Sequence, residues 1–165
     1  MVLETKFRST KRIELGSCAF RQWRAGITQE GGNKNKSSSH IHGYRLMAKI
    51  YFECKELDVN GFVVDYGSLK KLRDMLEETF DHTLAVAGDD PLLEQFESLS
   101  DLGGCDLRVF ANGVGIERFA EFTFHTADQF IKKTSHHRCW VSKVELWENE
   151  KNSAIFEVIN NKSSA

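Results

Sequence analysis

The stretch HIHGYRLMAKIYFE, His40 to Glu53, alternates apolar and polar residues from Tyr44 onward. This period of two predicts a half-buried β-strand, because successive side chains of a strand point to opposite faces. The apolar face of that strand holds Tyr44, Leu46, Ala48, Ile50 and Phe52. If the strand extends back to the two histidines, His40 and His42 join this face. Two imidazoles on one face can offer a pair of ligands to a metal ion.

Further elements flank this segment. Residues 12–20 have the character of a β-strand, and the polar stretch 26–39 that follows them predicts a mobile loop. Downstream, Ser68 is placed to cap a helix whose apolar stripe runs to Phe80. A short helix is predicted after Asp90, because the next residue is a proline, which suits the first helical position.

The second half of the chain predicts a strand, a long helix and a hairpin. The strand lies at 107–111, and the helix at 116–133 has an unusually wide apolar face. The hairpin covers 140–159 and turns at NEKN, residues 149–152. One face of its first strand holds Trp140, Ser142, Val144, Leu146 and Glu148. Together these elements predict an α+β fold in which helices cover one face of an antiparallel sheet, as a single domain over residues 1–165.

Composition and charge exclude several classes of partner. Hydrophobic residues make up 41% of the chain and charged residues 28%, which is ordinary for a globular protein. The formal net charge of −2 at pH 7 offers no broad basic surface, so we expect neither nucleic acid nor a membrane as a partner. A small-molecule ligand or a protein partner is the expectation that remains.

Cysteine usage indicates the compartment. The four cysteines are far apart and form no CxxC pair, and the chain does not begin with the apolar run of a secretory signal. No segment is apolar over the length of a membrane span. We therefore expect a reduced, cytoplasmic protein.

Several motifs follow one another along the chain. They are GSCAFR at 16–21, HIHGY at 40–44, NGFVVDYGSLK leading to FDHTL at 60–84, GIERFA at 115–120 and VELWEN at 144–149. As a series, from about Ile13 to Phe156, they resemble the 6-pyruvoyltetrahydropterin synthase and 6-carboxytetrahydropterin synthase family. The resemblance implies the tunnelling fold, in which sheets of neighbouring subunits join side by side into a barrel with active sites between the chains. It therefore implies a homo-oligomer, which we expect to be a hexamer.

The resemblance implies an enzyme of the lyase type. The chain is most similar to 6-carboxytetrahydropterin synthase, which acts on 7,8-dihydroneopterin triphosphate and forms a 6-substituted tetrahydropterin on the way to 7-deazaguanine bases such as that of queuosine. Two other functions stay open on the same fold. One is a metal-free enzyme similar to dihydropterin aldolases, and the other is a non-catalytic module that binds a pterin or a purine.

The resemblance also assigns site residues. Glu148 matches the glutamate that grips the guanidine-like edge of the pterin, where a carboxylate accepts two parallel N–H bonds. Asp81 and His82 match the pair that moves protons during the reaction. Ser38 stands at the position of the family's catalytic cysteine, and Glu117 matches a glutamate near the ligand.

The family's metal site is altered in this sequence. Family members hold zinc with one histidine of the first strand and two of a His-Gly-His motif. His42 matches the first histidine of that motif, but Phe20 and Tyr44 stand at the positions of the other two ligands. Phenylalanine has no lone pair and a phenol is a poor zinc ligand, so we expect Tyr44 to contact the substrate. His40 can supply a second nitrogen beside His42, yet the substitutions weigh against an intact zinc site.

Overall fold

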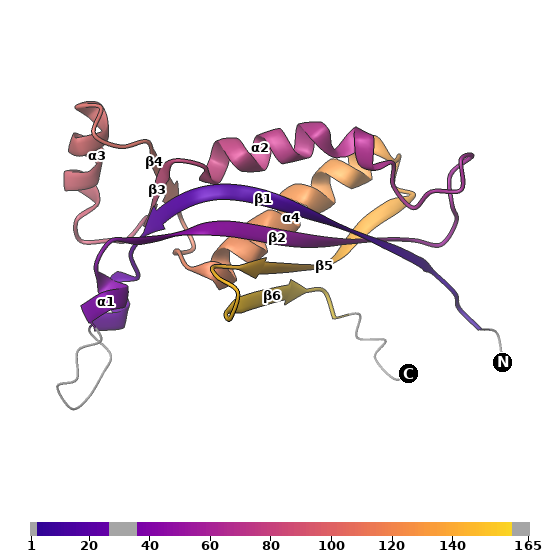
Figure 1. Ribbon diagram of the computed structural model, residues 1–165, viewed down its shortest axis with the longest axis horizontal. Helices are drawn as coiled ribbons and strands as arrows, with labels where there is room; N and C mark the ends of the chain where they lie inside the picture. The colour runs from indigo at the N-terminus through magenta and orange to yellow at the C-terminus, as the bar shows by residue number, and fades with distance from the viewer. Residues whose placement is uncertain (1–2, 27–35, 160–165) are drawn as a thin grey trace.

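The computed structural model describes residues 3–26 and 36–159, which form an α+β fold around a curled sheet (Figure 1). Most of the loop predicted at 26–39 lies outside the described residues, and its last part forms the short helix α1, Lys36–Ser39. Within the described ranges, no helix combines the length and the apolar character needed to cross a membrane.

The sheet is antiparallel over most of its width and parallel at one edge. Its strands lie in the order β4, β3, β1, β2, β5, β6. Their bounds are β1 Phe7–Phe20, β2 His42–Cys54, β3 Thr83–Ala87, β4 Leu107–Phe110, β5 Cys139–Trp147 and β6 Ser153–Glu157. β1, β2, β5 and β6 pair antiparallel, whereas β3 runs parallel to both β1 and β4. The α+β class is confirmed, and the antiparallel sheet of the prediction is corrected to a mixed one.

The parallel edge arises from a strand that the sequence pattern does not reveal. Every residue of β3 is buried, so the strand lacks the alternation of apolar and polar residues that marks a half-buried strand. Helix α3, Leu93–Asp101, then carries the chain from β3 to β4. Such a helical crossover is the usual way to join two parallel strands.

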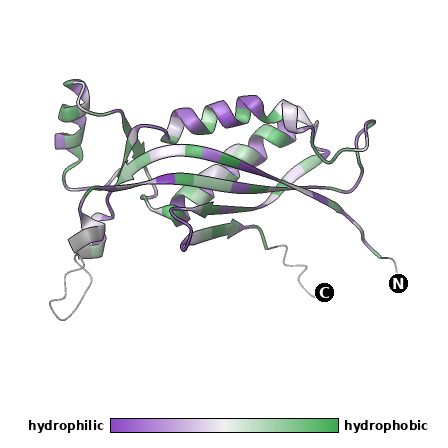
Figure 2. Cartoon of the chain, viewed as in Figure 1, coloured by the Kyte–Doolittle hydropathy of each residue, from purple (hydrophilic) through white to green (hydrophobic). Residues whose placement is uncertain are grey.

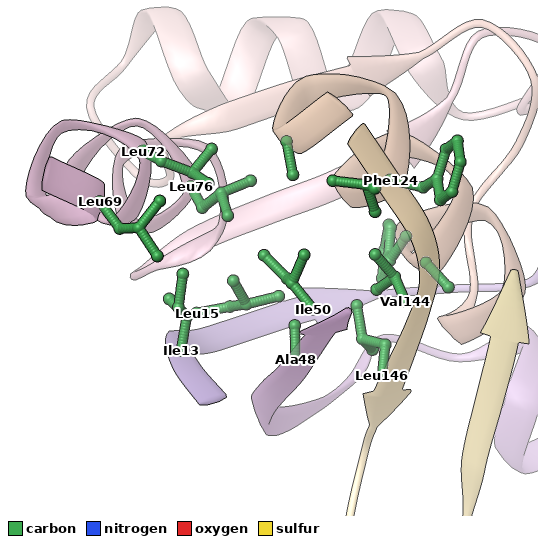
Figure 3. Close-up of a cluster of buried hydrophobic side chains, with 14 of the residues drawn as sticks. Ile13, Leu15, Ala48, Ile50, Leu69, Leu72, Leu76, Phe124, Val144 and Leu146 are labelled. Atoms are coloured by element: carbon green, nitrogen blue, oxygen red, sulfur yellow. The ribbon is translucent and has the colours of Figure 1, made fainter. Parts of the chain in front are cut away.

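The two long helices cover the same face of the sheet (Figure 1), as predicted. They are α2, Lys70–Phe80, and α4, Ile116–Thr134. Hydrophilic and hydrophobic residues alternate along α2 (Figure 2), and its buried stripe ends at Phe80. Figure 3 shows Leu72 and Leu76 of this stripe among the side chains of the strands below. The wide apolar face of α4 is confirmed, since it buries Phe119, Ala120, Thr123, Phe124, Ala127 and Ile131.

The helix starts differ from those predicted. A 3-10 turn, Tyr66–Leu69, precedes α2, and its cap is Asp65, whose Oδ1 accepts a 2.9 Å bond from the backbone N–H of Gly67. The Ser68 hydroxyl donates instead to the carbonyl of Asp65, at 2.6 Å. The short helix α3 begins three residues later than Asp90.

A β-bulge alters the predicted face of β5. Relative to β2, this strand contains one extra residue at Ser142. The extra residue shifts the alternation, so Val141 and Val144 are 2% and 0% exposed. Trp140 and Ser142 therefore do not share the buried face with Val144, whereas Leu146 does.

Candidate active site

Three aromatic side chains meet where β1 ends and β2 begins. The strand register pairs Phe20 with His42, and Tyr44 follows on the same strand. The ring centroids of Phe20 and His42 lie 4.7 Å apart, those of His42 and Tyr44 5.7 Å, and those of Phe20 and Tyr44 6.1 Å. The positions that match the family's zinc ligands thus come together in space. We name Phe20, His42 and Tyr44 the aromatic cluster.

The aromatic cluster is anchored in the core through Phe20. This residue is 1% exposed, and its ring lies 5.2 Å from that of Phe119 in α4, almost at a right angle. His42 is half-buried, and its Nδ1 lies 2.8 Å from the carbonyl oxygen of His40, whose own side chain is exposed. A carbonyl oxygen only accepts hydrogen bonds, so Nδ1 is the donor and the neutral ring keeps its lone pair on Nε2.

Asp81 and His82 form a hydrogen-bonded pair between α2 and β3. His82 Nδ1 lies 3.0 Å from Asp81 Oδ1, and the same oxygen accepts a 2.9 Å bond from the backbone N–H of Ser17. The bond from Ser17, followed by the bond from His82, holds the pKa of Asp81 below its usual value. A charged carboxylate at Nδ1 orients the imidazole and leaves Nε2 as the atom that exchanges protons.

The backbone of His82 is in the left-handed region. Its φ is 56°, and its N–H donates a 2.7 Å bond to the carbonyl of Ser17. Such a conformation costs a non-glycine residue on the order of 1 kcal/mol or more, and it clusters at active sites and ligand clamps. The His82 side chain is 86% exposed, so it is open to a ligand from solvent. Strain and exposure together favour a functional role for this histidine.

Gly16 lets Asp81 approach β1. It lies at a β-bulge with a φ of 89°, and a Cβ on it would be 2.1 Å from Asp81 Oδ1. Sequence reasoning missed both this residue and Ser17 as supports of the Asp81–His82 pair. The available signal was a glycine inside a predicted strand, which indicates a bulge or a close backbone approach.

An open hollow of about 430 Å³ lies over the adjoining ends of β1, β2 and β3. It is lined by Ser17, Cys18, Ala19, Gly43, Tyr44, Arg45, His82 and Thr83. Tyr44 and His82 thus border one space, and Tyr44 joins that space to the aromatic cluster. Burial raises the pKa of the Cys18 thiol, so this cysteine is not an activated nucleophile. A larger hollow of about 590 Å³ beside β4 and α4 contains none of the predicted site residues.

Ser38, Glu117 and Glu148 lie outside the 430 Å³ hollow. Ser38 belongs to α1, and Glu117 is exposed in the first turn of α4. Glu148 directly follows β5 and is half-buried, and Asn152 donates a 3.0 Å bond to its Oε1. A single chain therefore does not bring these three residues to His82 in that hollow.

The residues at the zinc positions do not fit zinc. A catalytic zinc site takes three nitrogen, sulfur or oxygen donors from the protein. The aromatic cluster offers one imidazole nitrogen, from His42, and the neutral phenol of Tyr44. In residues 3–26 and 36–159, no three His, Cys, Asp or Glu side chains are grouped so that they could hold a metal ion.

Known proteins with similar sequences are tetrahydropterin synthases. The family profile described as 6-pyruvoyl tetrahydropterin synthase matches residues 16–158. A 6-carboxy-5,6,7,8-tetrahydropterin synthase of Rickettsia bellii is 36% identical over 120 residues, which cover 71% of this chain and 82% of the relative. The protein of the same name from Rickettsia felis is 27% identical over 118 residues, with the same coverage of 71% and 82%.

Solved structures share the fold. An uncharacterised protein of Wolinella succinogenes has a TM-score of 0.76 at 20% identity, over 93% of this chain and 98% of that one. The 6-pyruvoyl tetrahydropterin synthase of Caenorhabditis elegans has a TM-score of 0.60 at 19% identity, over 96% and 100%. These similarities confirm the fold predicted from the motifs.

Proposed function

The chain belongs to the 6-pyruvoyl tetrahydropterin synthase family, and on that premise we propose that it is a lyase that converts 7,8-dihydroneopterin triphosphate to a 6-substituted tetrahydropterin. The name of the Rickettsia relatives, 6-carboxy-5,6,7,8-tetrahydropterin synthase, supports a carboxy product. We extend the proposal to a place in the synthesis of 7-deazaguanine bases such as that of queuosine, which the sequence motifs led us to expect. The observation that carries the proposal is the Asp81–His82 pair, whose histidine borders the hollow. The free state of all four cysteines supports the cytoplasmic location expected from the sequence.

The Asp81–His82 pair supplies the proton transfers that the reaction needs. Loss of triphosphate and rearrangement of the side chain both require protons to leave and return to substrate atoms. An imidazole can do this, and a carboxylate at Nδ1 orients the ring and leaves Nε2 as the atom that exchanges protons. In this chain the carboxylate is fixed by the backbone of Ser17, so the orientation of His82 is set before any substrate arrives.

Glu148 is the proposed anchor for the pterin ring. The guanidine-like edge of a pterin presents two parallel N–H donors, and a carboxylate accepts both. The bond from Asn152 occupies Oε1 of Glu148 in the free protein and must lengthen or be shared when the ring binds. We assign Tyr44 and Glu117 to the surroundings of the substrate and Ser38 to the position of the family's cysteine.

The complete site is proposed to form between copies of the chain. Glu148 and His82 do not share a hollow in one chain, and the resemblance implies sites between neighbouring subunits in a hexamer. The edge strand β6 supports this assembly, because Ile155 in it is 53% exposed and Val158 just after it is 55% exposed. An apolar edge strand of this kind is an open template for pairing with another chain.

Turnover of the proposed substrate tests the function. The purified protein is incubated with 7,8-dihydroneopterin triphosphate, with and without added zinc, and the pterins are separated by chromatography. We expect a 6-carboxy or 6-pyruvoyl pterin to appear, and Glu148→Ala to slow its formation at limiting substrate. Glu150→Ala is the matched control, because Glu150 is an exposed carboxylate of the same turn. Unchanged substrate in every sample would refute the proposal.

A non-catalytic pterin-binding module is the second candidate. The observation that favours it is the replacement of two zinc ligands by Phe20 and Tyr44, since a degenerate metal site is typical of a protein that has lost its reaction. Tight binding of the dihydropterin without any product would identify this function. The metal-free, aldolase-like reaction would instead release a shortened pterin, which the same chromatography separates.

A further inference from the structure

The family's chemistry implies a zinc ion, and the aromatic cluster occupies the positions of its ligands. A catalytic zinc site needs three protein donors around the metal. His42 provides one free lone pair, at Nε2, because its Nδ1 donates to the His40 carbonyl at 2.8 Å. Phe20 has no donor atom, and the neutral phenol of Tyr44 is a weak one. The aromatic cluster therefore lacks two of the three donors that a catalytic zinc site needs.

Packing holds the Phe20 ring in this position. Its centroid lies 4.7 Å from that of His42, 5.2 Å from that of Phe119 and 6.1 Å from that of Tyr44, all within the range of aromatic contacts. The residue is 1% exposed. A ring enclosed in this way cannot turn aside for an ion without opening a gap in a close-packed core. The space beside His42 is thus filled by hydrocarbon.

The described part of the chain shows no group of replacement donors. Residues 1–2, 27–35 and 160–165 contain neither histidine nor cysteine. In the remaining, described part of the chain, no three His, Cys, Asp or Glu side chains lie together in a way that could hold a metal ion. His82 uses its Nδ1 in the hydrogen bond to Asp81, so this nitrogen is not a free donor for zinc.

We infer that this chain does not bind zinc at the family's metal position, and that Phe20 closes it. The inference rests on the family assignment and on the geometry of the aromatic cluster. It deepens the proposed function, because any turnover by this chain then depends on its own acid–base groups and continues in the presence of a chelator. The metal content of the protein does not depend on turnover, so the two claims can fail separately.

The test measures zinc in the wild-type protein and in a variant with the ligands restored. Untagged protein from zinc-supplemented cells is analysed by mass spectrometry, and its melting temperature is recorded with added zinc and with EDTA. We expect wild-type zinc at the buffer background and no shift of the melting temperature. Phe20→His combined with Tyr44→His restores three imidazoles, so we expect this variant to retain zinc and to melt higher with the metal than with EDTA.

The control variant combines Phe20→His with Tyr51→His, which adds the second imidazole to the same strand away from the cluster. We expect it to stay at background. The inference would be overturned if the wild-type protein carried zinc in proportion to the number of its chains and the His42→Ala variant lost that zinc. A folded Phe20→His, Tyr44→His variant without zinc would overturn the assignment of these positions. If that variant does not fold, the zinc content of the wild type still decides.

Discussion

Replacing Gly16 by alanine tests how the Asp81–His82 pair is held. The new Cβ would lie 2.1 Å from Asp81 Oδ1 and 2.4 Å from Asp81 Cβ, so Asp81 would have to move away from β1. The alanine would also adopt a φ of 89°, and a left-handed backbone costs an L-residue about 1–2 kcal/mol. The expected result is a loss of unfolding free energy larger than this backbone cost, together with loss of the bond from Ser17 to Asp81.

Gly61→Ala is the matched control for this change. Gly61 has a φ of 80°, and nothing lies within 4 Å of the position of its Cβ. This variant carries the backbone cost of about 1–2 kcal/mol without the collision, and we expect its turnover to match that of the wild type.

Urea denaturation compares the two variants, and turnover of the dihydropterin is measured in parallel. We expect Gly16→Ala to lose more stability than Gly61→Ala, and its turnover to fall by about 10²-fold or more because His82 loses its orientation. Equal stability losses and equal turnover in the two variants would show that the contact between Gly16 and Asp81 does not hold the Asp81–His82 pair.

Further predictions concern pH, the core and the end of α4. The pKa of Asp81 is lower in the folded protein than its unfolded value of about 3.9. The stability that this carboxylate contributes is therefore complete above the unfolded pKa and is lost as the pH falls through the folded pKa. In urea titrations, the loss of unfolding free energy caused by Asp81→Asn should be constant near neutral pH and should shrink in acid. A deficit that stays constant in acid would contradict this. Leu76→Ala removes a fully buried side chain and should cost about 2–5 kcal/mol in urea, whereas Met75→Ala, at 40% exposure, should cost far less. Similar costs for the two would contradict the packing of α2. His137 has a φ of 63°, so His137→Gly should raise the unfolding free energy by about 1 kcal/mol, and Ser135→Gly, at a φ of −96°, should lower it. A loss of stability in His137→Gly would argue against strain there.

Local patterns predicted the elements that have one buried face. The alternation from Tyr44 to Phe52 predicted β2, and the apolar stripe ending at Phe80 predicted α2. In both elements the burial of a side chain depends on its position in a regular repeat, so the sequence carries the same repeat. β3 was missed because burial of both faces removes the alternation. The bulge at Ser142 was missed because an extra residue leaves no mark in the composition of the strand.

Strand register brings together the residues at the family's zinc positions, as the motifs led us to expect. The pairing of β1 with β2 places Phe20 beside His42, and the motifs locate both strands. The contact between Gly16 and Asp81 joins residues far apart in the sequence, so no local pattern contains it. Glu148 and His82 do not border the same hollow in the chain, and no local pattern relates residues so far apart in the sequence.

In the proposed function, His82 carries protons in a tetrahydropterin synthase reaction. The most direct measurement compares kcat/KM for 7,8-dihydroneopterin triphosphate in the wild type, His82→Ala and His136→Ala. His136 is the control, because it is also an exposed histidine with a left-handed backbone, at a φ of 51°. We predict a loss of about 10²–10⁴-fold for His82→Ala and no loss for His136→Ala. Turnover by His82→Ala at the wild-type rate would show that His82 does not carry these protons.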